Sequence, residues 1–225
     1  MMEKKKRATP WKPGKVISIS LRNGVYVLAQ MVRDPYLVFF NHFNEENNWK
    51  GVTLKEEDIL FCKAVTRQFL RYSPVAIIKE VTPLLDYELP KEWIYSHIGG
   101  HPITVSVKGR ERQLAGFGRR CSLVLADKDS GQPEDNPLMG LFQAYIIPDI
   151  KEQDWDRVGQ AEHMSIEVFP TLNERLYLCF LYGKNINPEQ DISLGKPLPD
   201  DYETYIDILT NSPEARRLYL GEHEE

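Results

Sequence analysis

Histidine residues are the first candidates for chemistry in this sequence. His97 and His101 are four positions apart, a spacing at which one face of a helix presents two metal ligands. Gly99, Gly100 and Pro102 lie beside them, and such residues disfavour a helix. No cysteine or acid completes a ligand set at a usual spacing. We therefore interpret the pair as loop histidines and expect neither a metal site nor a cofactor.

His163 is a second candidate, because Glu162 and Glu167 are close to it in the sequence and could exchange a proton with it. In an extended strand, His163 and Glu167 would share one face with Ser165. Nothing in the sequence places a nucleophile beside them. An enzyme that uses His163, or the earlier histidine pair, is one alternative for the function.

Two loops resemble ligand-binding loops only in part. Gly116-Phe117-Gly118 precedes Arg119 and Arg120, and glycine-rich loops with arginines can bind phosphate. Strand-like residues follow this loop where a helix would be needed, so a bulged hairpin with solvated arginines is the better interpretation. A later loop has acids but lacks the order and the terminal glutamate of a calcium loop: Asp127, Asp129 and Asp135.

The composition is that of an ordinary folded protein with an acidic end. The chain has 225 residues, of which 42% are apolar and 27% are charged, and its net charge is −5. Residues Asn185 to Glu225 contain ten acids and three bases. Because phosphate contacts need a basic surface, this segment disfavours nucleic acid and favours a basic protein partner. A solvated acidic helix and tail would contain the same residues.

Cysteine usage and the N-terminus indicate a compartment. Cys62, Cys121 and Cys179 are far apart, and each lies in an apolar, strand-like run. We expect buried reduced thiols rather than a disulfide framework. Residues Met1 to Arg7 are basic, but no apolar stretch of the signal-peptide type follows them. No apolar run is long enough to span a bilayer, so these features predict a cytoplasmic protein without a membrane partner.

A hairpin between Trp11 and Asn41 is the strongest structural signal. Asn23-Gly24 indicates a two-residue type I′ turn, in which both central residues have positive φ. That turn sets a register in which three pairs face one another on a mostly apolar, buried face: Leu21 with Tyr26, Ile19 with Leu28, and Ile17 with Gln30. Asp34-Pro35 makes a second turn, and Tyr36 to Phe43 is typical of a third strand. Three tightly connected strands predict a strongly bent meander or a small barrel.

The same part of the chain has a recognisable order of features. A glycine precedes the first strand, an Asn-Gly hairpin and an aromatic follow, a small and a polar residue end the second strand, and the third strand is aromatic: Gly14, Val16, Ile19, Asn23, Gly24, Tyr26, Ala29, Gln30, Phe39 and Phe40. Ile59 to Val65 and an extended stretch from Val75 to Lys79 continue the pattern. Over roughly the first ninety of its 225 residues, the chain resembles the immunity protein 26 family of bacterial polymorphic toxin systems. Leu28-Ala29 stands where that family often has Tyr-Gly.

The rest of the chain indicates further strands and then helices. Two prolines between Thr82 and Pro90 favour a connector that divides an N-terminal barrel-like domain, residues 1–90, from a second β-rich region, residues 91–225. A single domain is the alternative. The expected later elements are two strands and two helices: His163–Pro170, Arg175–Tyr182, Asp201–Leu209 and a last helix from Ser212 to about Leu220. The fold class is therefore α+β, with the helices gathered at the C-terminus.

The resemblance implies a function without catalysis, because members of that family are thought to bind a toxin. We expect an immunity protein that occludes a cognate toxin domain, such as a nuclease. The candidate contact residues are exposed aromatics and C-terminal acids: Trp49, Asp200, Asp201, Tyr202 and Glu203. Trp49 could instead fold back over the core. An SH3-like module that binds nucleic acid or peptides is a further alternative, and the sequence leaves the oligomeric state open.

Overall fold

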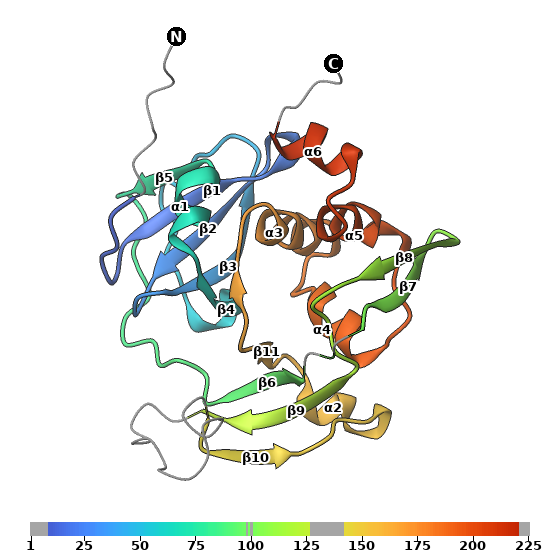
Figure 1. Ribbon diagram of the computed structural model, residues 1–225. Helices are drawn as coiled ribbons and strands as arrows, with labels where there is room; N and C mark the ends of the chain where they lie inside the picture. The colour runs from blue at the N-terminus through green and yellow to red at the C-terminus, as the bar shows by residue number, and fades with distance from the viewer. Residues whose placement is uncertain (1–8, 98, 100, 127–141, 221–225) are drawn as a thin grey trace. The chain divides into compact units, whose positions relative to one another are not determined.

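Segments that are far apart in the sequence build each of two units in this protein (Figure 1). A computed structural model describes residues 9–97, 99, 101–126 and 142–220. The first unit comprises Met1–Glu88, Ser165–Ile186 and Pro213–Glu225, and the second comprises Leu89–Met164 and Asn187–Ser212. The change of unit after residue 88 lies next to the connector expected at Thr82–Pro90. The division into domains 1–90 and 91–225 stays a prediction, and the units also include later returns of the chain.

The first unit is built on a six-stranded sheet with the order β12-β4-β3-β2-β1-β5. The first three strands form the predicted antiparallel meander, and a fourth strand extends it: β1 Val16–Ser20, β2 Tyr26–Met31, β3 Tyr36–Asn44 and β4 Ile59–Val65. β5 (Val75–Ile78) pairs antiparallel with β1, and β12 (Ile166–Glu167) pairs parallel with β4. The register shifts between β2 and β3 and between β3 and β4. Such bulges bend a sheet, which agrees with the strong curvature expected from the sequence.

The turn between β1 and β2 confirms the predicted backbone but not the predicted register. Asn23 has φ 59° and Gly24 has φ 74°, so both are positive as expected. Leu21 N donates to Val25 O, and Val25 N donates to Arg22 O. Two residues of the first strand side, Leu21 and Arg22, therefore oppose the single residue Val25, which is a bulge. This extra residue moves β2 by one position, and Ile19 faces Val27 where we expected Leu28. Tyr26, Leu28 and Gln30 therefore lie on the face opposite Ile19.

A helix covers the inner face of this sheet, which is the face of Ile17, Ile19 and Val27. α3 (Thr171–Tyr182) contributes Leu172, Leu176 and Cys179 to the same buried cluster as these strand residues. The strand expected over Arg175–Tyr182 is therefore wrong, as is the single strand over His163–Pro170. A short apolar run buried on all sides has no periodicity that separates a helix from a strand. Gly183, with φ 63°, ends the helix.

The outer face of the sheet carries Ser18 and Ser20, and a connecting segment covers part of it. Gln30, which is 3% exposed, donates from Nε2 to Leu84 O and accepts from Leu84 N at 2.8 Å each. Two short helices complete the unit, α1 (Arg67–Tyr72) before β5 and α6 (Pro213–Leu220) at the end of the chain. The last helix had been expected over nearly the same residues.

The second unit has its own sheet, with the order β10-β9-β6-β11. Its strands are β6 Glu92–His97, β9 Arg120–Leu125, β10 Ala144–Ile147 and β11 Glu162–His163. A separate hairpin is formed by β7 (Ile103–Val107) and β8 (Arg110–Leu114). Its helices are α2 Trp155–Val158, α4 Pro188–Leu194 and α5 Glu203–Leu209. The α+β class, the N-terminal meander and the C-terminal helices are thus confirmed, and no helix in the described part of the chain is long and apolar enough to cross a membrane.

A buried ion pair fastens the β1–β2 turn to α3. Arg22 donates from Nε and from a terminal nitrogen to the two carboxylate oxygens of Glu174, at 2.9 and 3.0 Å, and the Glu174 side chain is 0% exposed. Tyr219 of α6 donates its hydroxyl to the same carboxylate. The Arg22 guanidinium also lies 3.7 Å from the ring centre of Tyr177. Burial opposes the charge on Arg22, but the bond to Glu174 raises its pKa on balance.

We predict that Arg22→Ala lowers the free energy of unfolding of the first unit by about 3–5 kcal/mol, because it leaves the Glu174 carboxylate buried without its cation. Native-state hydrogen exchange of the β2 amides reports this unit separately from the other. Arg67→Ala is the matched control, since Arg67 is exposed and forms no ion pair with any described residue. It should change stability by less than about 0.5 kcal/mol. Equal effects of the two variants would show that the buried pair is dispensable.

Candidate functional site

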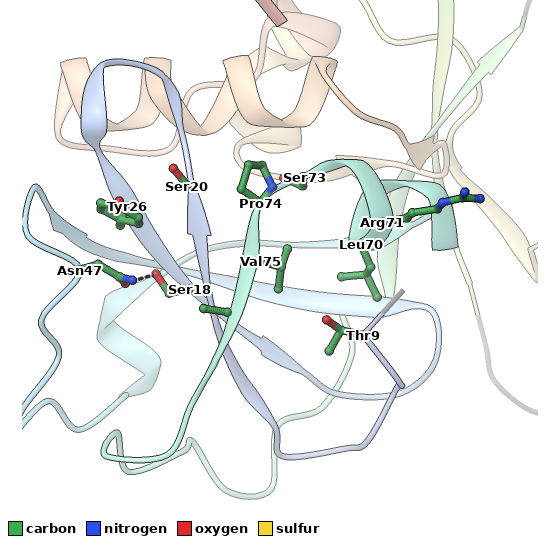
Figure 2. Close-up of a pocket in the computed structure, with 11 residues that line it drawn as sticks. Thr9, Ser18, Ser20, Tyr26, Asn47, Leu70, Arg71, Ser73, Pro74 and Val75 are labelled. Carbon is green, nitrogen blue, oxygen red and sulfur yellow. Dashed lines mark hydrogen bonds between the residues drawn. The ribbon is translucent and has the colours of Figure 1, made fainter. Parts of the chain in front are cut away.

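A groove of about 500 Å³ lies on the outer side of the first unit and is the best candidate for a binding site. Figure 2 shows its arrangement: Tyr26 and Asn47 lie beyond β1 on one side, and Leu70 and Arg71 of α1 lie beyond β5 on the other. Between them are residues of β1, of β5 and of the junction before it: Ser18, Ser20, Ser73, Pro74, Val75 and Ala76. The groove is thus built from strands, a helix and a loop of one unit.

Asn47 is held in a fixed orientation at the end of this groove. Its Oδ1 accepts from Ser18 Oγ at 2.6 Å and from Trp49 Nε1 at 2.8 Å. Its backbone has φ 51°, a left-handed conformation that asparagine tolerates better than most residues. Because both donors use the carbonyl oxygen, the Nδ2 amine of Asn47 is left as a hydrogen-bond donor toward a ligand.

Three further side chains that line the groove have polar groups without a hydrogen-bond partner in the described part of the chain. They are the hydroxyl groups of Ser20 and Tyr26 and the guanidinium of Arg71. All three can donate, and Arg71 also adds a positive charge. No acidic side chain is among the described residues that line the groove. The groove therefore suits a ligand rich in acceptors and negative charge.

α3 positions the two sides of the groove from within the unit. Asn173 Oδ1 accepts from Ser73 Oγ at 2.9 Å, and Asn173 Nδ2 donates to Ser20 O at 3.2 Å. Ser73 stands just before β5, and Ser20 ends β1. One buried asparagine therefore fixes the spacing between the two chain segments that form the groove.

Two of the predicted contact residues are buried rather than exposed, and that expectation was wrong. Trp49 is 2% exposed and folds back to donate to Asn47, as the alternative interpretation of its loop allowed. Tyr202 is also 2% exposed, and its hydroxyl donates to Asp191 at 2.6 Å. Both side chains are amphipathic, so burial of the ring is favourable wherever the polar atom finds a partner.

The predicted acidic contact residues lie in the second unit, beside a basic hairpin. Asp200 and Asp201 are exposed in a short 3-10 helix, η4 (Asp200–Tyr202). Glu203 accepts from Lys108 Nζ at 2.6 Å, and that hydrogen bond lowers the pKa of Glu203. Arg110 lies 3.6 Å from the same carboxylate. The acidic segment is therefore partly neutralised within its own unit, and the contact role of these acids stays a prediction.

The histidines of the second unit occupy structural positions. His97 Nε2 lies 2.8 Å from Ser122 Oγ, and Ser122 donates to Pro148 O at 2.6 Å. Burial, followed by the positive charge of Arg120, lowers the pKa of His97, while Asp149 acts in the opposite direction. His101 is exposed and lies outside any strand or helix. His97 is the last residue of β6, so its interpretation as a loop histidine was wrong, whereas His101 does lie in a loop, and the two do not share a helical face.

His163 does not form the acid–base group considered from the sequence. Its Nδ1 lies 2.9 Å from Ser96 Oγ and 4.0 Å from Glu189 Oε1. Glu162 instead accepts from Asn187 Nδ2 at 3.2 Å, and Glu167 belongs to the first unit, 3.7 Å from Lys63. Ser96 and Glu189 are thus the partners that the sequence did not reveal, because they come from distant elements. In a catalytic triad the serine and the acid bind opposite ring nitrogens, whereas here both approach Nδ1.

The remaining candidate residues either contact their own unit or lie outside the described residues. Arg119 donates to Ile192 O and Thr104 O, at 3.1 and 3.0 Å, rather than lining a phosphate site. All three cysteines are buried and lie outside any disulfide, and burial raises the pKa of Cys121. In the described ranges, no group of three or more His, Cys, Asp or Glu side chains is placed to hold a metal ion. The basic N-terminal stretch and the loop with Asp127, Asp129 and Asp135 lie outside the described residues.

Comparison with known proteins gives one match. The family described as a domain of unknown function, DUF8309, matches residues 5–108, which is less than half of the chain. The chain is similar to this family over all five strands at the start of the first unit and over β6 and β7 of the second. No curated protein and no solved structure matches the chain. Because that description assigns no function, the resemblance to the immunity protein 26 family stays a prediction.

We predict that Asn47→Ala destabilises the first unit by about 2 kcal/mol or more, because it removes the acceptor of two donors on buried residues, Ser18 and Trp49. Asn47→Asp should cost less, since it keeps an acceptor oxygen at the same place. Urea denaturation of both variants, with the exposed neighbour replaced in Asn48→Ala as a control, measures the difference. If Asn47→Asp were as unstable as Asn47→Ala, the two hydrogen bonds would not be what holds this loop.

We also predict a pH dependence from His97. Its folded pKa lies below the unfolded value of about 6.5, so the unfolded chain binds the proton at a higher pH. The stability that neutral His97 contributes is present above about pH 6.5 and is lost as the pH falls toward the folded pKa. His97→Gln should therefore reduce the loss of stability on acidification, measured by urea denaturation across this range. The exposed His101→Gln is the control and should follow the native chain.

Proposed function

We propose that this protein binds and occludes a toxin domain, in the manner of an immunity protein, and that it uses the groove of the first unit to do so. The observation that carries the proposal is the groove itself. It is open, it is formed by strands, α1 and a loop, and it presents three hydrogen-bonding groups that the described chain does not use: Ser20 Oγ, Tyr26 OH and Asn47 Nδ2. The guanidinium of Arg71, 5.4 Å from the ring centre of Tyr72, adds a positive charge at its edge.

The contacts of the other candidate residues support a binding role over a catalytic one. The side chains of His97 and Arg119 are engaged in hydrogen bonds to their own unit. His163 lies among buried side chains that join strands to α4. The resemblance of the first ninety or so residues to immunity proteins adds to this support, because those residues contribute most of the groove.

The proposal is tested by growth rescue in a bacterial host. The chain is expressed together with the toxin domain encoded by the adjacent reading frame, and the toxin alone should stop growth. The native chain should restore growth and should copurify with the toxin domain. Tyr26→Ala with Arg71→Glu should lower protection by about tenfold or more in colony counts, because it removes an aromatic and reverses the charge of the groove.

A matched control separates the groove from general effects of such changes. Tyr145→Ala with Arg120→Glu makes the same two kinds of substitution at exposed positions of the second unit. This control should protect as well as the native chain, and thermal unfolding should show that both double variants fold. A native chain that neither protects nor copurifies would refute the proposed function.

A further inference from the structure

β5 ends the six-stranded sheet, and the direction of its backbone groups can be worked out from its pairing with β1. Ser20 N donates to Pro74 O at 2.9 Å, so these two residues form a hydrogen-bonded pair. In an antiparallel ladder such pairs alternate with non-hydrogen-bonded ones. Ala76, which faces Ser18, therefore directs its N–H and C=O toward β1. Val75 and Ile77 direct theirs away from the sheet.

The outward backbone groups of Val75 and Ile77 have no partner among the residues that the structure describes. Ile77 is 47% exposed, which is unusual for a large apolar side chain in a strand. An edge of this kind is a template on which another strand can pair. The first unit thus offers a short main-chain binding site with an apolar side chain beside it.

The groove and this edge are parts of one surface. Val75 and Ala76 both line the groove, although successive side chains of a strand point to opposite faces. The groove thus lies against β5, which is the edge strand of the sheet, and Leu70 and Arg71 of α1 lie beyond this strand (Figure 2). An extended segment that paired with β5 would lie along the groove, within reach of its free donors.

The charges beside this surface are positive. Arg71 lines the groove, Arg67 is one turn earlier on the same face of α1, and Lys79 directly follows β5. These three cations form no ion pair with any described residue. Two exposed acids are adjacent in sequence to residues of this surface: Glu80 follows Lys79, and Glu46 precedes Asn47 at the far end of the groove. A ligand with carboxylates would therefore be attracted here, and one with lysines would be repelled.

We propose that the partner contributes an extended, acidic peptide segment that adds to the sheet as a strand beside β5, with its carboxylates toward Arg71 and Lys79. This inference rests on the proposed function for the identity of the partner, but its chemistry can be tested alone. The free backbone edge favours a peptide over nucleic acid, because a phosphate backbone cannot continue a sheet ladder. The half-buried side chain of Val75 in the groove and the exposed side chain of Ile77 on the same strand also favour a peptide.

The sharpest variant is Ile77→Pro. Proline removes the outward N–H of residue 77, and an edge strand tolerates it because that N–H is not part of the β1 ladder. The change should abolish pairing with an added strand while the fold remains, as checked by thermal unfolding. Ile77→Ala is the matched control, since it shortens the same side chain and keeps the backbone donor.

The first arm of the test uses the full chain and synthetic probes. Amide NMR signals are followed during titration with a short alternating threonine–glutamate peptide, its threonine–lysine counterpart and a short oligothymidylate, each up to about 1 mM. We expect the acidic peptide to shift the signals of Val75 and Ile77, and the basic peptide to leave them unchanged. Ile77→Pro should raise the dissociation constant of the acidic peptide by about tenfold or more, and Ile77→Ala should raise it by about threefold or less. No shift with the acidic peptide, equal shifts with the basic one, or shifts at this edge with oligothymidylate would each overturn the inference.

The second arm repeats growth rescue with the two Ile77 variants and separates this inference from the proposed function. We expect Ile77→Ala to protect and Ile77→Pro to fail. If Ile77→Pro protected as well as the native chain, the proposal that a partner strand pairs with β5 would be wrong. The proposal that the protein binds a toxin would remain. If the native chain gave no protection, toxin binding would be wrong, and the peptide titration alone would decide whether β5 accepts an acidic strand.

Discussion

The burial of one carboxylate constrains the whole first unit. Glu174 is 0% exposed, and a charge in that position is tolerable only because Arg22 approaches it with two hydrogen bonds. The two residues are separated by 152 positions, so the bond brings the turn of the first hairpin against a helix from the second half of the chain. Asn173, the residue just before Glu174 in the same helix, forms hydrogen bonds with Ser20 at the end of β1 and with Ser73 just before β5. The inner face of the sheet thus determines where the outer groove can form.

Local patterns in the sequence predicted the strands that are closed by short turns. β4 has the bounds of the run Ile59 to Val65 singled out from the sequence, and the positive φ values of Asn23 and Gly24 follow from the residue types. The predicted register of β1 and β2 was wrong because the bulge depends on the hydrogen bonds of Val25, and a pattern of apolar residues does not indicate these bonds. The strand predicted over residues 175–182 was wrong for a related reason, since burial on most sides of a helix removes the periodicity that distinguishes it from a strand. The return of residues 165–186 to the first unit has no local signal at all.

The site was less predictable than the fold. Trp49 and Tyr202 attracted interest as aromatics in polar surroundings, yet each has a nearby oxygen that allows its ring to be buried: Asn47 for one and Asp191 for the other. The groove residues are ordinary serines, a tyrosine, an asparagine and an arginine from five places in the chain. They are candidates because several of their side-chain donors have no hydrogen-bond partner in the described structure, and this can be seen only once the chain is folded. The apolar run of β5 and the proline before it were the available signals for the edge itself.

The order in which this chain is synthesised gives the discontinuous first unit a further consequence. Its five N-terminal strands leave the ribosome well before residues 171–182 exist. Until then Ile17, Ile19 and the other residues of the inner face lack the cover of α3, and of the described helices only α1 contributes to their cluster, through Phe69 and Leu70. The stretch that matches DUF8309 ends at residue 108, so a fragment cut there would contain five of the six strands of the sheet and would lack β12 and α3. Nascent chains of this protein therefore expose an apolar sheet during elongation, and chaperones that bind such surfaces would meet it at that stage.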